Sequence, residues 1–456
     1  MISNIVENSV FKYFEEICKI PRGSGNEKAM QNYLVNFAIK NNLPYFKDNF
    51  NNVIIFKKTC DKEPIILQAH TDMVCVKSPK SKVDFLVDPI QIVKKGNFLT
   101  AKETSLGADD GIGVALILDI LSSDIPVNIE AVFTSSEETT MEGAYKIDVK
   151  KLKSKKMICL DGFEGNTVMT SSASFTDFYI WFESEKVFIE ENIKNKTYLI
   201  SLSGLEGGHS GFDIDKNRGS SHKLLTQLLL KIPSLKINRL FGGHNYNVIP
   251  SKTECVFTTD IDEKDLKNII KYFYVQNKKI YKNLKIKCSR QLNQNLIIKK
   301  GQEILNFIKD FNHGVFCKQN NHVVASQNLS EICAEKGYFK VGLRSSSKQK
   351  EEEMLKNLKE LCKRYKFQCK IEDTQPAFNT FENSKLLSDL IKYGDSPKEV
   401  KMHIAVECGI FQERVKKLDV VIISPTITDA HSVNEKLDID STNQTSNWLK
   451  NYLKNY

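Results

Sequence analysis

The chain has 456 residues, which is long for one domain and sufficient for two or three. Apolar residues make up 41% and charged residues 27%, as in ordinary globular proteins with a sizeable core. The net charge is +9, but the basic residues are spread along the chain, and their densest run (150–156) has no interleaved aromatic residues. Neither nucleic acid nor a membrane is therefore an expected partner.

The 11 cysteines are scattered from Cys18 to Cys408 without a C-x-x-C pair. This spacing argues against a disulfide framework and favours reduced thiols. The N-terminus has neither the basic stretch nor the apolar stretch of a signal peptide, and no run approaches the ~20 apolar residues of a membrane span. We therefore expect a cytoplasmic protein.

The first part of the chain alternates between amphipathic helices and short apolar strands. Helices are predicted at 6–19 and 26–40, the second capped by Asn26, and an apolar helix at 111–121. Strands are predicted at 53–56, 65–68, 129–134 and 157–160, with two short strands within 85–99. This alternation predicts an α/β fold with a mostly parallel, doubly wound sheet.

The pattern changes after about residue 176. Strands with an alternating, antiparallel character are predicted at 178–182, 198–202, 255–259, 284–289, 339–343 and 367–371, with helices at 217–231, 263–276 and 346–364. This α+β region, 177–377, reads as an inserted domain with an exit linker at 374–378. The first domain, 1–176, resumes at 378–456, with helices at 384–393, capped by Ser384, and 441–453, and strands at 400–404 and 420–424.

Polar residues follow the strands of this discontinuous first domain. The strand before His70 and Asp72 is apolar, and ligands of open parallel sheets bind beyond the carboxyl ends of the strands. Residues i and i+2 of extended chain share a face, so His70 could ligate a metal while a carboxylate holds its other ring nitrogen. The alternative is a core histidine beside a loop cap.

The other candidates occupy the same position at strand ends or helix starts: Asp109, Asp110, Glu137, Glu138, Asp161 and His431. Each has a plain alternative as a helix cap, a turn or a loop residue. Imidazole and carboxylate donors without clustered cysteines suit zinc, manganese or cobalt. There are more donors than one tetrahedral ion uses, so we expect two ions roughly 3.5–4 Å apart.

Seven stretches, taken in order, resemble the co-catalytic di-zinc peptidase family that includes carboxypeptidase G, aminoacylases and peptidase T. Within this family the chain is most similar to the aminoacyl-histidine dipeptidases, over nearly its whole length. The stretches are QAHTDMV at 68–74, SLGADDGIG at 105–113, TSSEE at 134–138, LDG at 160–162, GLEGGHSG at 204–211, ECGIF at 407–411 and PTITDAHS at 425–432.

The resemblance implies roles in a catalytic domain, residues 1–176 and 378–456. His70 and Glu138 match ligands of different ions, as do Asp161 and His431, and Asp109 matches the bridging carboxylate. Asp72 matches the residue that orients His70, and Glu137 the general base. A cis peptide between Asp109 and Asp110 is also implied.

The inserted domain, 177–377, would then be a lid that helps to bind substrate and closes over it. His209 matches a lid histidine that stabilises the oxyanion, although a histidine in a tight turn is the alternative. Arg344 could bind a terminal carboxylate, although an ordinary surface arginine is the alternative. Asn247 and Glu407 are further substrate-binding candidates, and Glu407 could instead cap a helix. Whether His209 and Arg344 serve their own or a neighbouring subunit's site stays open.

Some positions depart from the closest pattern and bear on substrate preference, not on the ligands. Asp110 stands where relatives often carry Asn, and Cys75 and Phe163 replace more polar or proline-containing turns. The segment SVNE at 432–435 replaces the commoner Ser-Pro-Asp-Glu.

The expected function is therefore that of a di-metal dipeptidase, most simply a zinc enzyme, with manganese or cobalt as alternatives. It would hydrolyse unblocked dipeptides, with Xaa-His such as β-Ala-His as an implied preference, by attack of a metal-bridging hydroxide with Glu137 as the general base. The alternatives are an N-acyl amino acid amidohydrolase on the same scaffold and a catalytically idle binding protein. A homodimer formed through the lid is a further implication.

Overall fold

The computed structural model describes residues 8–190 and 194–456, and these form two compact units. Unit 1 comprises the chain up to Ser172 together with Phe378–Lys401 and Val406–Tyr456. Unit 2 comprises Ala173–Ala377 and the short segment Met402–Ala405. The predicted class, an α/β protein carrying an inserted α+β domain, is confirmed.

Unit 1 is built on one eight-stranded sheet in the order β1-β2-β6-β3-β7-β23-β8-β22. β3 pairs in parallel with both β6 and β7, β7 pairs in parallel with β23, and β8 with β22. β3 and β6 are buried at every position, as expected for parallel strands covered on both faces. The strands are β1 Tyr45–Lys47, β2 Val53–Lys57, β3 Ile65–His70, β6 Ile129–Thr134, β7 Lys156–Cys159, β8 Thr167–Ser171, β22 Lys398–Lys401 and β23 Asp419–Ile422.

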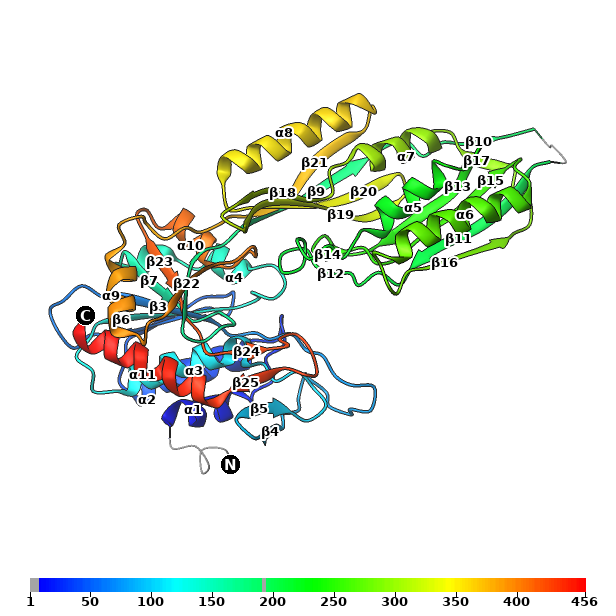
Figure 1. Ribbon diagram of the computed structural model, residues 1–456. Helices are drawn as coiled ribbons and strands as arrows, with labels where there is room; N and C mark the ends of the chain where they lie inside the picture. The colour runs from blue at the N-terminus through cyan, green and yellow to red at the C-terminus, as the bar shows by residue number, and fades with distance from the viewer. Residues whose placement is uncertain (1–7, 191–193) are drawn as a thin grey trace. The chain divides into compact units, whose positions relative to one another are not determined.

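Helices cover both faces of this sheet, which confirms the doubly wound prediction. In Figure 1, α1 (Ser9–Ile17), α2 (Lys28–Lys40), α3 (Ala108–Ser122) and α11 (Ile439–Asn455) lie below the sheet, and α4 (Glu142–Lys146) and α10 (Cys408–Arg414) lie above it. α9 (Lys385–Tyr393) packs against α11 and β23. A small sheet of β24 (Ile427–Thr428), β25 (Lys436–Asp438), β5 (Phe98–Ala101) and β4 (Ile92–Lys95) completes the unit.

The helix starts show where local sequence signals succeed. Asn8 caps α1 by accepting a hydrogen bond from Val10 N, and residues 6 and 7 of the predicted helix lie outside the described residues. Ser384 caps α9 as predicted, because its Oγ accepts from Leu387 N at 2.9 Å.

The prediction that Asn26 caps α2 is wrong. Asn26 N donates to Gly23 O, so this residue closes a turn, and Glu27 occupies the N-cap position. The Glu27 carboxylate accepts from Gly25 N and from Ser136 N and so ties this turn to the segment after β6.

Unit 2 contains one antiparallel nine-stranded sheet in the order β16-β11-β15-β13-β19-β20-β9-β21, with β18 paired to β19. Four helices, α5 (Ser221–Leu229), α6 (Glu263–Lys278), α7 (Gly301–Asp310) and α8 (Lys348–Arg364), pack on one face (Figure 1). The strands are β9 Ser174–Trp181, β11 Lys196–Ser203, β13 Lys236–Gly243, β15 Thr253–Thr259, β16 Lys285–Arg290, β18 Gly314–Gln319, β19 His322–Cys333, β20 Tyr338–Ser345 and β21 Gln368–Gln375.

The alternation predicted for this region is confirmed along β9, where buried positions alternate with more exposed ones. Phe178, Ile180 and Phe182 face a core that includes Phe307 and Phe339. Shorter strands, β10 (Lys186–Phe188), β12 (Gly208–His209), β14 (Val248–Ile249) and β17 (Leu296–Ile298), join the loops of the unit.

Several predicted boundaries are wrong. α7 was not predicted, β21 runs to Gln375 and so occupies the start of the expected linker, and β22 ends at Lys401 instead of 404. The first strand of the 85–99 region begins only at Ile92, after a turn in which Asp84 Oδ1 accepts from Leu86 N. The ends of β21 and β22 are set by pairing with β9 and β8, which lie far along the chain and which a local pattern does not contain.

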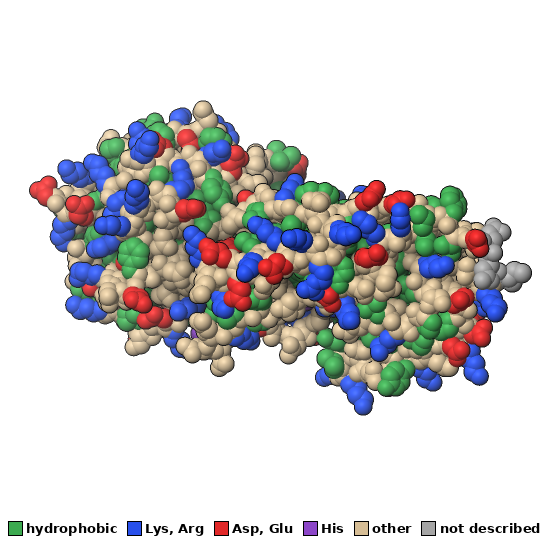
Figure 2. All heavy atoms as spheres, turned by 90° about the horizontal axis from the view of Figure 1, so that it is seen from above, with side chains coloured by type: hydrophobic (Ala, Val, Ile, Leu, Met, Phe, Trp, Pro, Cys, Tyr) green, Lys and Arg blue, Asp and Glu red, His purple; other side chains and the backbone are tan. Residues whose placement is uncertain are grey.

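The surface matches the expectation from composition. On the face drawn in Figure 2, Lys and Arg side chains are interspersed with Asp and Glu side chains and do not form one basic patch. No helix in the described parts of the chain combines the length and apolar character needed to cross a membrane.

Candidate metal centre

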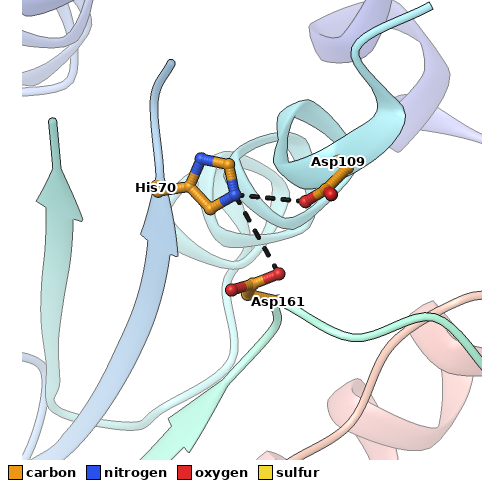
Figure 3. A group of neighbouring side chains, drawn as sticks. All are labelled: His70, Asp109 and Asp161. Atoms are coloured by element: carbon orange, nitrogen blue, oxygen red, sulfur yellow. Dashed lines mark hydrogen bonds and ion pairs between the residues drawn. The ribbon is translucent and has the colours of Figure 1, made fainter. Parts of the chain in front are cut away.

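The carboxyl ends of three neighbouring parallel strands bring the predicted polar residues together. His70 is the last residue of β3, Glu137 and Glu138 follow β6, and Asp161 follows β7. Asp109 lies in the first turn of α3. Figure 3 shows the His70 ring pointing between the carboxylates of Asp109 and Asp161.

The distances connect all five predicted ligands. His70 Nε2 lies 3.1 Å from Asp109 Oδ1 and 3.9 Å from Asp161 Oδ1. His431 Nε2, from the loop between β24 and β25, lies 3.0 Å from Asp109 Oδ2 and 2.9 Å from Glu138 Oε2. Asp109 thus presents one oxygen to each histidine, which is the arrangement that a bridging carboxylate needs.

Asp72 organises the residues around His70. Its Oδ1 lies 3.5 Å from His70 Nδ1, and Ser24 Oγ donates to its Oδ2 at 2.7 Å. The backbone N–H groups of Glu137 and Glu138 donate to its two oxygens at 3.0 and 3.2 Å. Burial would raise the pKa of Asp72, but the contact with His70 and these donors holds its pKa below the usual value. The group is therefore an ionised carboxylate that orients its neighbours.

The centre holds more carboxylate side chains than histidine rings that could carry a positive charge. Burial, followed by the proximity of Asp109, raises the pKa of Asp161 to about 7, and burial also raises the pKa values of Glu137 and Glu138. Burial opposes protonation of His431, yet hydrogen bonds to Asp109 and Glu138 raise its pKa to about 10. Such crowding creates a demand for positive charge at this point.

The donor set fits that demand. Three overlapping groups have their ligand atoms within 4.8 Å of one another: His70, Asp109 and Asp161; His70, Glu137 and Glu138; and Asp109, Glu138 and His431. Glu138 Oε1 is buried, and among the described residues it has no hydrogen-bond partner. Imidazole nitrogens and carboxylate oxygens around an orphan acceptor suit borderline divalent cations such as zinc.

Asp110 has a supporting position. The peptide bond between Asp109 and Asp110 is cis, as the resemblance predicted. The Asp110 carboxylate accepts from His70 N at 3.2 Å and from Gly113 N at 3.1 Å. It therefore joins the end of β3 to the start of α3.

Glu407 lies in the same unit, one residue before α10, and is 1% exposed. Gln68 Nε2 donates to its Oε2 at 2.7 Å, and Thr134 Oγ1 donates to the same oxygen. Burial raises the pKa of Glu407 to about 8. Its side chain does not cap α10, because no side-chain hydrogen bond joins it to that helix.

The other three predicted residues lie together in unit 2. Arg344 Nη2 is 3.2 Å from His209 Nε2, and Arg344 Nε donates to Ser210 Oγ at 3.1 Å. Asn247 O accepts from Ser210 N at 2.7 Å. Arg344 is 3% exposed and its guanidinium lies 4.1 Å from the centre of the Phe175 ring, so the alternative of an ordinary surface arginine is wrong.

Local sequence signals did not reveal the residues that hold the predicted ones in place. Ser24 lies in the turn between α1 and α2, and Gln68 and Thr134 lie on β3 and β6. A serine in a Pro-Arg-Gly-Ser-Gly break is a weak signal for a hydrogen-bond donor. Nothing local links Gln68 or Thr134 to Glu407, which lies 339 and 273 residues away along the chain.

Known proteins resemble the chain along nearly its whole length. It is 26% identical over 480 residues to the cytosol non-specific dipeptidase of Escherichia coli, covering 99% of this chain and 98% of that protein. The crystal structure of aminoacylhistidine dipeptidase from Vibrio alginolyticus has a TM-score of 0.85 and 26% identity, covering 100% of this chain and 98% of the other.

A more distant structure shares the fold alone. Aminopeptidase PepT from Bacillus cereus has a TM-score of 0.57 and 14% identity, covering 98% of this chain and 97% of its own. Residues 66–455, which span all five predicted ligands, match the sequence pattern of a single family. The chain belongs to peptidase family M20/M25/M40 and is a hydrolase acting on peptide bonds.

Proposed function

We propose that this protein is a di-metal dipeptidase that hydrolyses unblocked dipeptides. The observation that carries the proposal is the position of Asp109 between two histidines. Its Oδ1 lies 3.1 Å from His70 Nε2, and its Oδ2 lies 3.0 Å from His431 Nε2. Membership of the family and the names of two full-length relatives, a non-specific dipeptidase and an aminoacylhistidine dipeptidase, support the same activity.

Five residues would hold the metal ions: His70, Asp109, Glu138, Asp161 and His431. Zinc is the first candidate for this set of nitrogen and oxygen donors, with manganese or cobalt as alternatives. When bound, two divalent cations would polarise the scissile carbonyl and lower the pKa of the attacking water. Asp72 contributes by holding His70 Nδ1, so that Nε2 faces Asp109 and Asp161.

Glu137 is the proposed general base. Its backbone N–H is fixed by Asp72, and its pKa is raised by burial and by the neighbouring Asp161 and Glu138. A carboxylate with a raised pKa accepts a proton from water more readily and can return that proton to the leaving amine. One group therefore serves as base and then as acid.

Unit 2 would supply the substrate contacts. Arg344 is buried, and burial lowers its pKa to about 9, so an anionic partner such as the terminal carboxylate of a dipeptide would stabilise its charge. His209, 3.2 Å from Arg344, would stabilise the oxyanion, and Asn247 would add a further contact. Glu407, which belongs to unit 1, is the remaining proposed binding residue. A preference for Xaa-His substrates, a cytoplasmic location and a homodimer formed through the inserted domain belong to the same proposal; for the first two the support is the relatives' names.

The test is a substrate panel with the purified protein loaded with zinc, manganese or cobalt. Free-amine dipeptides, including β-Ala-His, should be cleaved, N-acyl amino acids should not, and a chelator should abolish cleavage. Preferential cleavage of the acylated compounds would favour the amidohydrolase. If no compound is cleaved with any of the three metals, the protein would be a binding protein that keeps the fold.

A further inference from the structure

A buried glutamate binds the loop that carries Asp109. Glu435 is 2% exposed and lies four positions after His431. Its Oε2 accepts from the backbone N–H groups of Leu106 at 2.7 Å and Gly107 at 2.9 Å. Its Oε1 accepts from Ala108 N at 2.8 Å and Asp109 N at 3.3 Å. One carboxylate thus satisfies four consecutive backbone donors.

A buried arginine binds the same loop through its carbonyl oxygen. Arg22 is 2% exposed, and its Nη2 donates to Gly107 O. Its Nη1 donates to the carbonyl oxygens of Thr71 at 3.1 Å and Asp72 at 2.9 Å, immediately after His70. Arg22 therefore connects the segment that carries His70 and Asp72 to the segment that carries Asp109.

The two charged side chains bind the backbone of one residue, Gly107. Its N–H binds Glu435 and its carbonyl binds Arg22, and its φ of +68° is in the left-handed region that favours glycine. A Cβ at this position would come within 2.5 Å of Arg22 Nη2 and 2.7 Å of Met73 Sδ. The loop conformation is thus fixed by two charges and a glycine.

The connections run between three ligand-bearing segments. Glu435 joins the His431 segment to the Asp109 loop, and Arg22 joins the Asp109 loop to the His70 segment. Removing two charges from water is costly, and an apolar loop contact could close the same turn. A carboxylate that accepts four backbone hydrogen bonds, however, allows the loop only a narrow range of positions. Because one of the four donors is Asp109 N, the Glu435 carboxylate also fixes the backbone of Asp109.

We propose that Glu435 and Arg22 are positioning residues that set the distance of Asp109 from His70 and His431, and with it the affinity of the centre for its metal ions. The inference rests on the proposed function, because it assumes that the centre holds metal. Residues that orient ligands without touching the metal typically change metal affinity or activity about 10–100-fold when they are altered.

The test compares Glu435→Gln with a matched control, Glu130→Gln. Glu130 is a buried carboxylate on β6 of the same unit, and it accepts from the backbone N–H groups of Lys153 and Ser154. In both variants an amide NH2 replaces one acceptor oxygen and faces backbone donors. We would measure Zn²⁺ affinity by competition with a chelator and record the visible spectrum of the Co²⁺-loaded protein. The third measurement is the thermal unfolding midpoint of the metal-free protein.

Glu435→Gln should weaken Zn²⁺ binding about 10–100-fold and change the Co²⁺ spectrum, while Glu130→Gln lowers the unfolding midpoint but keeps both metal properties. In Glu435→Gln, kcat should fall more than KM rises, because the substrate contacts are untouched. The inference would be overturned if Glu435→Gln had the Zn²⁺ affinity and the Co²⁺ spectrum of the unaltered protein.

A second variant, Arg22→Lys, keeps the test decisive if Glu435→Gln does not fold. Lysine retains the positive charge but lacks the planar fork that reaches three carbonyl oxygens, so Zn²⁺ affinity should again fall about 10–100-fold. Unchanged affinity would contradict the positioning role of Arg22. If the unaltered protein binds none of the metals, the proposed function itself fails. If the unaltered protein and both variants bind metal equally, only the positioning inference fails.

Discussion

The histidines of the two units have opposite electrostatic surroundings. In unit 1, His70 and His431 lie among carboxylates, and both have raised pKa values although burial opposes protonation. For His70 the contacts that overcome burial come from Asp109 and Asp72. These two imidazoles therefore lie where positive charge is favoured.

In unit 2, two histidines have neutral hydrogen-bond partners. His222, on α5, is fully buried, with Nδ1 2.7 Å from Thr253 Oγ1 and Nε2 3.3 Å from Ser330 O. His403 Nε2 lies 2.7 Å from Ser326 Oγ. Burial is the largest cause that lowers both pKa values to about 3. Both rings are therefore neutral at physiological pH.

The comparison shows that the neighbours of a histidine decide its use. A ring surrounded by carboxylates leaves a site in which a divalent cation is stabilised, whereas a ring bonded to hydroxyl and carbonyl groups is a packing element. The sequence contains part of this distinction: His70 leaves the end of a strand beside Asp72, whereas His222 lies within a helix that has a buried apolar face.

The largest expected effect comes from removing the shared charge in unit 1. Asp109→Asn keeps the shape of the side chain but takes away the carboxylate that contacts both histidines. Metal binding should be lost and dipeptide turnover should fall below detection, because bound metal contributes several kcal/mol to transition-state stabilisation. Metal analysis and steady-state kinetics measure these losses.

The same variant should also make His431 resemble the histidines of unit 2. In the metal-free protein its pKa, about 10 with Asp109 present, should fall, and an NMR titration measures the change. The control is Asp419→Asn, another buried carboxylate of unit 1, which accepts from Ser384 Oγ at 2.6 Å outside the centre. Full metal occupancy in Asp109→Asn would exclude a bridging role for Asp109.

A smaller effect is expected where a carboxylate of the centre serves as a base and not as a ligand. Glu137→Gln should retain metal but lower kcat about 10²–10⁴-fold, the usual contribution of general acid–base catalysis. Glu138→Gln is the matched comparison, since this neighbour lies 2.9 Å from His431 and should lose metal as well. A Glu137→Gln variant with unaltered kcat would reject Glu137 as the base.

A still smaller loss of activity is expected when Asp72, which orients His70, is altered. Asp72→Asn can still accept at one oxygen, but it presents an NH2 group either to His70 or to the N–H groups of Glu137 and Glu138. Metal affinity or kcat/KM should fall about 10–100-fold. The Co²⁺ spectrum measures this effect independently of turnover, and an unchanged spectrum with unchanged kinetics would remove Asp72 from the centre.

The core of the fold could be predicted from the sequence because its signals are local. The apolar runs of β3 and β6, the helix after Gly111 and the Ser384 cap each follow from a few adjacent residues. The ligands followed from polar residues at strand ends and from the family resemblance. That His70 and His431 share one carboxylate is a three-dimensional result that no spacing contains.

The remaining features depend on partners far along the chain. The burial of Arg344 follows from its packing against Phe175 and Ser210, and β21 extends to Gln375 because β9 offers it a paired strand. α7 carries buried residues at helical spacing, such as Ile304 and Ile308, but the segment is short and begins with glycine. Local patterns underestimate elements whose ends are set by tertiary pairing.

The smallest effect is on protein stability alone, and it tests whether the buried histidine His222 of unit 2 is neutral. His222 has a folded-state pKa of about 3, below the value of about 6.5 expected in an unfolded chain. Between these values the unfolded state binds more protons, so the stabilising contribution is complete above pH 6.5 and is lost as the pH falls toward 3. From pH 8 to pH 5, His222 should account for a loss of about 2 kcal/mol, and His222→Gln should lose that much less over the same interval.

Urea unfolding at the two pH values measures this difference in unit 2. The chain has 2 tryptophans, and in a Trp448→Phe background the fluorescence reports on Trp181 of β9. His322→Gln, at an exposed position at the start of β19, is the control and should keep the full pH dependence. If His222→Gln loses as much stability between pH 8 and pH 5 as its background protein, then His222 is not held neutral by burial. The contrast between histidines surrounded by carboxylates in unit 1 and neutral buried histidines in unit 2 would then not hold, since it requires that burial without a carboxylate keeps the ring unprotonated.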